Sequence, residues 1–440
     1  MHILSVIVWI VVFGGGLATT VAAQGAREMS VEEAVRLGLE RNPRIAAADA
    51  DAAGAEAAYR EARAAGLPAI RTQASYTRLG GSIPEGEVTL PGFDSTFTLL
   101  PIELNRYNSE VSVEQPVFTG GRVRGQVRAA SHEASSASLL AEQERVDIAF
   151  EVRRAYWTLF GAVARLETTD ASIAYVEDHV TDVENRLDQG AVLLSDALAA
   201  RTRRSEVMLD RVGAENEVRT AQLVLAQLTG LPLDTEIVPA LPAQPEAMPP
   251  LLDAAGGEAN RPAIEAMEEQ VLGFQAQLGA LRAGWLPELA VVGRYVYARP
   301  NPYAFTEQSE FRGTWEAGVA LRWNPWEGGR QSAAVAGARE RLRAAEARLQ
   351  DAREQATVDV AMQSLEVRRA TEAVRVAAEH VEQATESFRV SRDLFAEGVV
   401  LSAQVLEAEE AYRVALARRA RAQAEYEIAR AAVMHALGEI

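Results

Sequence analysis

The sequence has no cysteine among its 440 residues and no lysine, so all 44 basic residues are arginine. The absence of cysteine excludes disulfide bonds, thiolate metal sites, cysteine nucleophiles and a lipid anchor on an N-terminal cysteine. Acidic residues number 62, which gives a net charge of −18. A nucleic-acid-binding protein needs a basic surface to neutralise phosphates, so this charge argues against nucleic acid as a partner.

Aromatic residues are also scarce, at 6% of a chain that is 48% hydrophobic. The apolar share is therefore mostly alanine, valine and leucine, which is typical of closely packed helices. One long apolar run, from Ile3 to Phe13, precedes the A-x-A-like site Val21-Ala22-Ala23. This order predicts a cleaved signal peptide over residues 1–23. An uncleaved anchor helix is the alternative, because the segment is just long enough to span a bilayer.

The chain contains an internal repeat with one constant offset of 208 positions. Three glycine positions repeat in this way: Gly120-Gly121 recurs as Gly328-Gly329, Gly190 as Gly398, and Gly230 as Gly438. A constant offset without gaps indicates a duplicated unit. We therefore expect a first repeat over residues 24–230, a proline-rich connector over 231–257 and a second repeat over 258–440.

Each repeat carries a long heptad pattern of apolar residues. The first series is Val152, Leu159, Leu166, Ile173, Val180 and Leu187, and the series 208 positions later is Val360, Val367, Val374, Val381, Phe388 and Phe395. After each central glycine the pattern resumes, with Ala200, Val207, Ala214, Ala221 and Leu228 matched by Ala408, Ala415, Ala422, Ala429 and Ala436. Such heptads are typical of coiled coils. Each repeat is thus predicted to contain a long helical hairpin with its tip just after Gly190 or Gly398.

Ahead of each hairpin, apolar and polar residues alternate with a period of two. The predicted strands lie near Arg71–Leu79 and Val111–Val113 in the first repeat, and near Leu289–Tyr297 and Trp315–Trp323 in the second. A length near ten residues with aromatic ends is typical of a transmembrane β-strand, and a half-buried strand of a soluble protein is the alternative. Loops over Gly80–Arg106 and Arg299–Arg312 are expected to join the strands of each pair.

Proline and polar residues mark the ends of further elements. Each repeat is expected to open with a helix that ends near Leu67-Pro68 or Leu286-Pro287. Ser30 and Glu33 form a capping box at the start of the first such helix. Six prolines prevent the connector over residues 231–257 from forming a continuous helix.

The sequence contains no recognisable catalytic or metal-binding motif, so we expect neither an enzyme nor a cofactor. The five histidines are scattered along the chain. The Gly-Gly pairs that follow strands lack the G-K-[ST] ending of a phosphate-binding loop, so they are predicted to be turns that need glycine for its unusual φ. The arginine-rich run Arg201–Arg204 is predicted to be a solvated helix face.

Four strands are too few to close a membrane barrel, since the smallest such barrels have about eight. An open sheet edge in lipid leaves backbone groups unpaired at a cost of several kcal/mol each. If these are membrane strands, several chains must share one barrel. Two copies would supply eight strands and three copies twelve.

The order of these features resembles the TolC family of outer-membrane efflux proteins. The resemblance rests on the turns Pro116–Gly121 and Pro325–Gly329, on the tips that begin at Gly190 and Gly398, and on their duplication. It implies an α+β membrane protein of two tandem strand–strand–hairpin repeats, which forms a homotrimer with a twelve-stranded β-barrel continued by a twelve-helix periplasmic α-barrel. The implied function is the outer-membrane exit duct of a tripartite efflux or type I secretion system.

The same resemblance implies partners and site residues. The partners are outer-membrane lipid, a periplasmic adaptor protein and an inner-membrane transporter. The adaptor-contacting tips are Gly190, Ala191, Val192, Gly398, Val399 and Val400. The periplasmic aperture residues are Gln404, Glu407 and Asp196.

Two departures from the family pattern affect the aperture. Gln404 replaces one of the two expected carboxylates, so Glu407 alone would form an acidic ring. Val400 occupies the position of the arginine that would pair with Asp196. The alternatives are that the tips are ordinary helix turns, that Glu407 is an exposed helix residue, and that the chain is a membrane-tethered periplasmic coiled-coil scaffold without channel activity.

Overall fold

The computed structural model describes residues 27–80, 87–89, 96–98, 104–240, 261–303 and 310–439, so the predicted signal peptide lies outside it. The chain divides into two compact units. We call unit 1 the set of residues 1–38, 152–246 and 377–424, and unit 2 the set 39–151, 247–376 and 425–440. Each unit therefore combines segments from both halves of the sequence.

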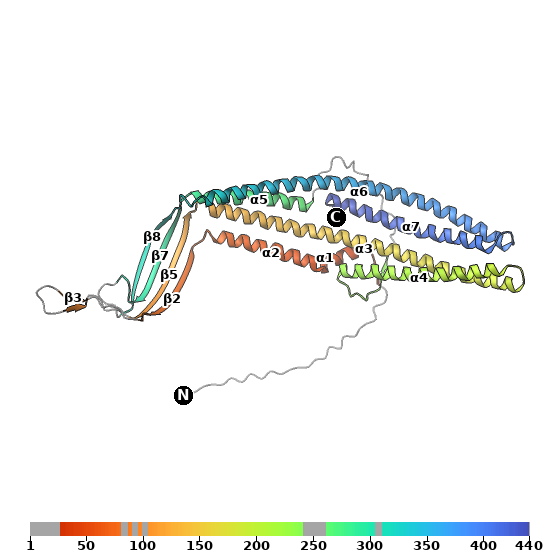
Figure 1. Cartoon of the computed structure of the whole chain (residues 1–440), viewed down its shortest axis with the longest axis horizontal. Helices are drawn as coiled ribbons and strands as arrows, with labels where there is room; N and C mark the ends of the chain where they lie inside the picture. Colours follow the sequence, from red (N-terminus) through yellow and green to blue (C-terminus); the bar gives the residue numbers. More distant parts are fainter. Residues whose placement is uncertain are drawn as a thin grey trace, which may run out of the picture. The chain divides into compact units, whose positions relative to one another are not determined.

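Figure 1 shows four long helices, α3, α4, α6 and α7, whose bounds reproduce the offset that the glycines predict. Helices α3 (Arg122–Asp188) and α6 (Arg330–Ala396) both have 67 residues. Helices α4 (Leu194–Thr229) and α7 (Ser402–Leu437) both have 36. Helix α6 begins and ends 208 positions after α3, and α7 begins and ends 208 positions after α4. The two predicted hairpins are therefore confirmed. Within the described ranges, no helix is both long enough and apolar enough to cross a membrane.

Glycines with positive φ stand at the start, the tip and the end of each hairpin. Their φ angles lie between 61° and 93° at Gly120, Gly121, Gly190, Gly230, Gly328, Gly329, Gly398 and Gly438. A residue with a Cβ atom adopts this left-handed backbone only at a cost of roughly 1–2 kcal/mol. The prediction that the Gly-Gly pairs are turns with special φ is confirmed.

The predicted heptad residues form the interior of the helical packing. In the first hairpin Val152, Leu159 and Val207 are fully buried. In the second, Ala415 is fully buried and Val360 nearly so. Because the buried positions are mostly valine and alanine, the helices can approach closely along their length.

The four predicted long strands form one antiparallel sheet within unit 2, in the order β2-β5-β7-β8 (Figure 1). They are β2 (Ala69–Arg78), β5 (Asn105–Phe118), β7 (Glu288–Arg299) and β8 (Arg312–Arg322). The central pair joins β5 from the first half of the sequence to β7 from the second. Both halves therefore contribute to a single sheet whose edges are β2 and β8.

The predicted loop over Gly80–Arg106 is wrong in part, because it contains a short antiparallel hairpin. This hairpin consists of β3 (Glu87–Thr89) and β4 (Thr96–Thr98). Three-residue strands carry too little alternation to stand out in a sequence. The described ends of the second loop, over Arg299–Arg312, follow the prediction.

The first half opens with two helices instead of the single helix that was predicted. They are α1 (Val31–Arg41) and α2 (Pro43–Ala64), while the second half opens with α5 (Pro262–Arg282) and a short 3-10 turn, η1 (Ala283–Trp285). Pro43 has no N–H to continue α1, and Asn42 accepts a hydrogen bond from the Arg44 N–H at 3.0 Å. The same Asn-Pro pair therefore ends one helix and starts the next.

Part of the connector is a strand of unit 1. Strand β6 (Ile237–Pro239) pairs in parallel with β1 (Arg27–Met29). The buried Tyr156 hydroxyl lies 3.0 Å from the carbonyl oxygens of both Met29 and Ala240, so it ties α3 to this pair. Burial raises the pKa of Tyr156 to about 12. The prediction that the connector is not a continuous helix holds for its described residues.

Candidate functional site

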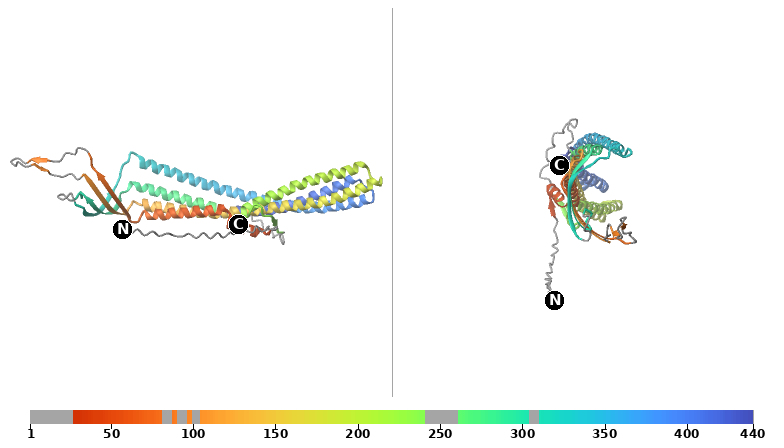
Figure 2. Two further views of the ribbon diagram at one scale, coloured as in Figure 1. Left: turned by 90° about the horizontal axis from the view of Figure 1, so that it is seen from below. Right: turned by 90° about the vertical axis from the view of Figure 1, so that its left-hand side faces the viewer.

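The two hairpin tips lie together in unit 1. They are the loops between α3 and α4, residues 189–193, and between α6 and α7, residues 397–401. Val192 and Val400, one from each tip, pack on a single hydrophobic cluster that includes Val183, Phe395 and Val405. Figure 2 shows the ends of the two hairpins side by side. The structure thus brings the two predicted tip segments into one surface.

The remaining predicted tip residues are exposed. Gly190, Ala191, Gly398 and Val399 all face outward, whereas Val192 and Val400 are half-buried. No atom lies within 4 Å of the place that a Cβ atom would occupy on either tip glycine. The glycines are therefore required by their φ angles and not by crowding, and the space beside them is open to a partner.

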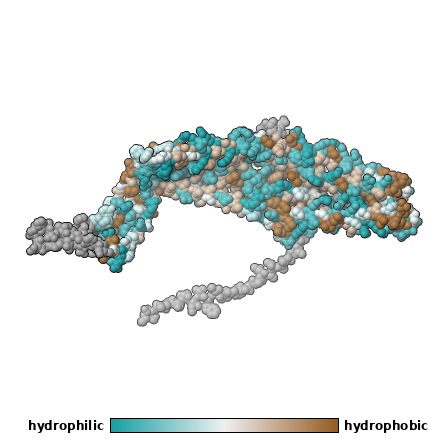
Figure 3. Space-filling view, in the orientation of Figure 1, coloured by the Kyte–Doolittle hydropathy of each residue, from teal (hydrophilic) through white to brown (hydrophobic). Residues whose placement is uncertain are grey.

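Sequence reasoning missed three exposed leucines at the tips. Leu193, Leu194 and Leu401 are each at least 60% exposed. Figure 3 shows hydrophobic residues gathered at the hairpin ends. The signal was present in the sequence, since an apolar run follows each tip glycine. Exposed apolar clusters of this kind mark sites that contact other proteins, membranes or ligands.

The predicted aperture residues lie within the first two turns of α4 and α7. Asp196 is the third residue of α4, and its carboxylate accepts a hydrogen bond from the Leu193 N–H at 3.2 Å. It therefore caps the positive end of that helix. Gln404 and Glu407 of α7 are exposed. Val400, which occupies the position of the expected arginine partner of Asp196, packs against the apolar cluster. Its side chain has no polar group that could pair with the Asp196 carboxylate.

A buried charged pair between the hairpins is a feature that sequence reasoning missed. Arg203 of α4 and Glu409 of α7 expose less than a tenth of their side chains, and Arg203 Nη2 lies 3.6 Å from Glu409 Oε2. The Ser172 hydroxyl of α3 donates to the second oxygen of the same carboxylate. This contact links three helices of unit 1 through one carboxylate.

The prediction of a solvated face over Arg201–Arg204 is wrong for Arg203. Four successive residues span more than a full helical turn, so one of them must face inward. Arg203 stands three positions after Ala200 and four before Val207, which is the alternate heptad position. That spacing was the signal that could have identified it as buried.

A second buried polar contact lies closer to the tips. His179 Nε2 of α3 is 2.7 Å from the hydroxyl oxygen of Ser402, the first residue of α7, and both residues are buried. The rings of Tyr175 and Phe395 flank the imidazole. Burial lowers the pKa of His179 below 6.5, so the neutral ring is favoured.

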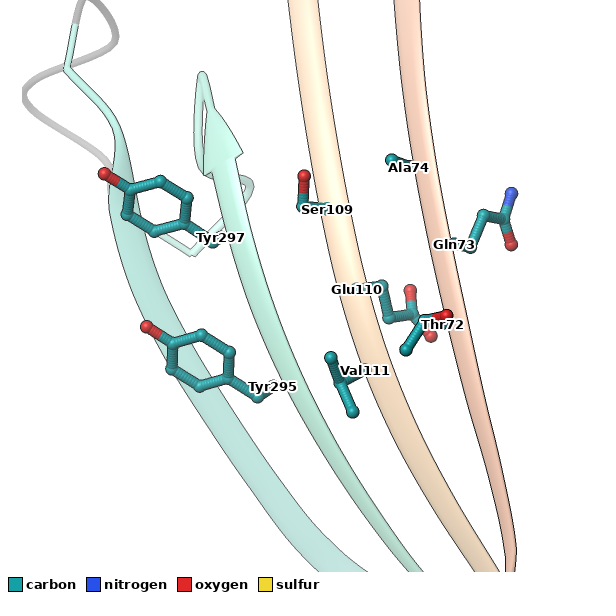
Figure 4. Close-up of a pocket in the computed structure, with 8 residues that line it drawn as sticks. All are labelled: Thr72, Gln73, Ala74, Ser109, Glu110, Val111, Tyr295 and Tyr297. Atoms are coloured by element: carbon teal, nitrogen blue, oxygen red, sulfur yellow. The ribbon is translucent and has the colours of Figure 1, made fainter. Parts of the chain in front are cut away.

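The sheet of unit 2 has two chemically different faces, because successive side chains of a strand point to opposite sides. One face exposes large apolar residues: Ile70, Tyr76, Val111, Val113, Tyr295, Tyr297, Trp315, Val319 and Leu321. Figure 4 shows Tyr295 and Tyr297 of β7 beside a depression that is also lined by Val111, Ser109 and Thr72. An apolar face of this extent is unfavourable in water and favours contact with an apolar phase.

The opposite face of the sheet is predominantly polar. It carries Arg71, Gln73 and Ser75 of β2, Glu110, Ser112 and Glu114 of β5, Arg294 of β7, and Thr314 and Glu316 of β8. The described residues contain no group of histidine, aspartate and glutamate side chains placed to hold a metal ion. The sheet thus has one apolar and one predominantly polar face, which is the pattern that period-two alternation predicts for a membrane strand.

The model of a family described as outer membrane efflux protein matches residues 34–231 and 257–439. The chain belongs to this family. Membership confirms the predicted family and the predicted outer-membrane location, and the members of this family are efflux proteins and not enzymes. Members of the family act in tripartite efflux pumps.

Two curated relatives of this efflux protein match over part of its length. The nickel-cobalt-cadmium resistance protein NccC of Alcaligenes xylosoxydans xylosoxydans is 23% identical over 196 residues, covering 44% of each chain. The outer membrane protein OprJ of Pseudomonas aeruginosa is 28% identical over 181 residues, covering 40% of this chain and 37% of the relative. The matched region thus spans less than half the length of each of these relatives.

Solved structures share the fold of the efflux protein over almost its whole length. The CmeC outer membrane channel of Campylobacter jejuni superposes with a TM-score of 0.79 at 15% identity, covering 93% of this chain and 85% of that one. The outer membrane protein VceC of Vibrio cholerae gives a TM-score of 0.76 at 20% identity, covering 93% and 96%. The predicted fold class of paired strands and long helical hairpins is confirmed.

Proposed function

We propose that the chain is the outer-membrane exit channel of a tripartite efflux pump or type I secretion system. In this proposal it is a passive conduit for small molecules or polypeptides, built from repeats over residues 24–230 and 258–440 that the connector 231–257 joins. The observation that carries the proposal is the four-stranded sheet with one apolar and one polar face. Family membership supports it.

The open edges of the sheet support a homotrimer. β2 and β8 are edge strands within the chain, and unpaired edges in lipid are costly. Three copies joined β8 to β2 supply twelve strands and leave no edge. The apolar face then contacts outer-membrane lipid and the polar face surrounds the lumen.

The hairpin tips are proposed to bind the periplasmic adaptor, through which the channel meets an inner-membrane transporter. The contact residues are Gly190, Ala191, Val192, Gly398, Val399 and Val400, to which the exposed Leu193, Leu194 and Leu401 are added. Support comes from the joint packing of the two tips and from the exposed apolar side chains around them. Such side chains gain free energy when a partner helix covers them.

The aperture is proposed to involve Asp196, Gln404 and Glu407. In a trimer, the exposed Glu407 would place three carboxylates around one opening and favour cations. We expect Glu407→Ala to lower the permeability ratio of potassium over chloride in planar bilayers. Glu397→Ala removes a carboxylate from the exposed tip loop and serves as the charge-matched control. An unchanged ratio for Glu407→Ala contradicts the ring.

The native mass of the protein, extracted from outer membranes in mild detergent, tests the proposed assembly. A trimer of the mature chain supports a shared barrel. A monomer or dimer contradicts it. Recovery from the inner membrane with residues 1–23 still attached would instead support the tethered scaffold.

Substitution at the second tip tests the adaptor contact. We expect Gly398→Trp to abolish efflux, because the indole would occupy the open space where the adaptor approaches. The trimer should still form, and cross-linking to the adaptor should be lost. Gly398→Ala introduces the same backbone strain without the bulk and should keep most activity. Loss of the trimer in Gly398→Trp, or efflux at the normal rate, contradicts the assignment.

A further inference from the structure

Five charged side chains gather in the middle of the polar face of the sheet. They occupy three consecutive rows of the strand register that share this face. The rows are Gln73–Glu110–Val296–Thr314, Arg71–Ser112–Arg294–Glu316 and Ala69–Glu114–Val292–Gly318. We call Arg71, Glu110, Glu114, Arg294 and Glu316 the charged band.

Ion pairs connect the band across all four strands. Arg294 Nε lies 3.2 Å from Glu110 Oε1 and 3.4 Å from Glu316 Oε1, so one guanidinium joins β7 to both of its neighbours. Arg71 Nη1 lies 3.1 Å from Glu114 Oε2 and joins β2 to β5. Each charge of the band therefore stands beside an opposite charge.

Stability does not account for these pairs. Their side chains are between a quarter and two-thirds exposed, and exposed ion pairs contribute about 0–1 kcal/mol at most. Their field still acts on any solute that passes within a Debye length of about 8 Å. In a narrow lumen, rings of charged side chains determine which ions enter.

We propose that the charged band determines the charge selectivity of the part of the lumen that the sheet lines, and that its two arginines keep the net charge of this part close to zero. This inference rests on the proposed function, in which the polar face lines a channel. With two arginines and three glutamates, the charged band of each chain carries one net negative charge. The wall therefore admits organic solutes of either sign with a mild preference for cations, and Arg294 is its main determinant because it neutralises two carboxylates.

A single cysteine can report the local potential, because the chain has none of its own. Ser112 lies in the same row as Arg71 and Arg294, so Ser112→Cys places a thiol inside the band. The measured quantity is the rate of modification by a cationic methanethiosulfonate divided by the rate with an anionic one. Both reagents attack the same thiolate, so a change in the thiol pKa cancels in this ratio.

Adding Arg294→Gln to the reporter should raise the ratio, since two carboxylates lose their counter-charge. Adding Glu110→Gln and Glu316→Gln together should lower it below the value for the reporter alone. Arg343→Gln removes an exposed helical arginine outside the band and should leave the ratio unchanged. Equal ratios in all of these trimers overturn the inference.

The apolar face provides the test that separates this inference from the proposed function. Val113→Cys, one residue further along β5, points to the opposite face and should resist both charged reagents in membranes. If Val113→Cys reacts and Ser112→Cys does not, the polar face does not line a channel and the proposed function itself fails. If only Ser112→Cys reacts, but its ratio is the same with and without Arg294→Gln, the proposed channel is supported and the charged band has no selective role.

Discussion

The two hairpins have the same backbone but different buried polar groups. Their helices agree in length residue for residue, and their tip glycines have φ angles of 71° and 74°. The buried polar residues of the first hairpin include Thr169, Ser172, His179 and Arg203, whereas the residues 208 positions later are Ala377, His380, Ser387 and Ala411. Duplication therefore retained what determines the backbone, while the polar contacts between the hairpins are not related by the repeat.

This difference separates the residues that determine the backbone of each hairpin from those that determine how the two hairpins contact each other. Glycines and heptad residues act within one hairpin, so each copy needs its own set. A polar contact between two unlike hairpins needs a donor on one and an acceptor on the other. Arg203 and Glu409 illustrate this, because the repeat counterpart of Glu409 is Arg201, which is exposed and pairs with Glu184 at the surface.

The largest expected effect comes from breaking the buried pair. Arg203→Met should lower the free energy of unfolding by about 3–5 kcal/mol, because it leaves the Glu409 carboxylate buried without a cation. Denaturant titration of the detergent-solubilised protein, followed by circular dichroism, measures this loss. The double variant Arg203→Met with Glu409→Leu should regain most of it.

Arg201→Met is the matched control for this pair, since it removes an arginine from the same helix. Its partner is exposed, so the expected cost is about 1 kcal/mol or less. Equal losses for the two arginines would contradict the distinction between a buried and a solvated pair.

A smaller, pH-dependent effect should come from His179, which belongs to the first hairpin alone. Burial lowers its folded-state pKa, the neighbouring Asp182 opposes this shift, and Arg186 adds to it. The folded protein therefore binds this proton less readily than the unfolded chain does. The contribution of His179 is fully present above pH 6.5 and is lost as pH falls through the folded-state pKa, at up to about 1.4 kcal/mol per pH unit.

His179→Gln should flatten this part of the stability profile between pH 7 and pH 5. Unfolding measured at closely spaced pH values provides the test, and the profile of His380→Gln should follow that of the wild type. His380 is the control because it lies on the second hairpin, at the repeat counterpart of Ser172. A steep profile that persists in His179→Gln would contradict the role of the buried imidazole.

The sequence was sufficient for features that repeat or that depend on local backbone. Gly190 and Gly398 located both tips, and the period-two pattern located all four long strands. The parallel pairing of β1 with β6 was not predictable, because each strand has three residues and they are more than 200 positions apart. The burial of Arg203 depends on its position around the helix and not on the composition of the run Arg201–Arg204. The break between α1 and α2 is encoded locally, by the Asn42-Pro43 pair.

The smallest effect concerns the feature that the hairpins share. Gly190→Ala and Gly398→Ala should each cost roughly 1 kcal/mol, because both glycines have similar positive φ and both have open space where the methyl group would lie. Gly213→Ala, in the interior of α4 and also with open space, should instead stabilise the protein by roughly 0.5–1 kcal/mol. Thermal unfolding of the three variants measures these differences. Unequal costs at the two tips would show that the hairpins differ in backbone strain as well as in their polar contacts.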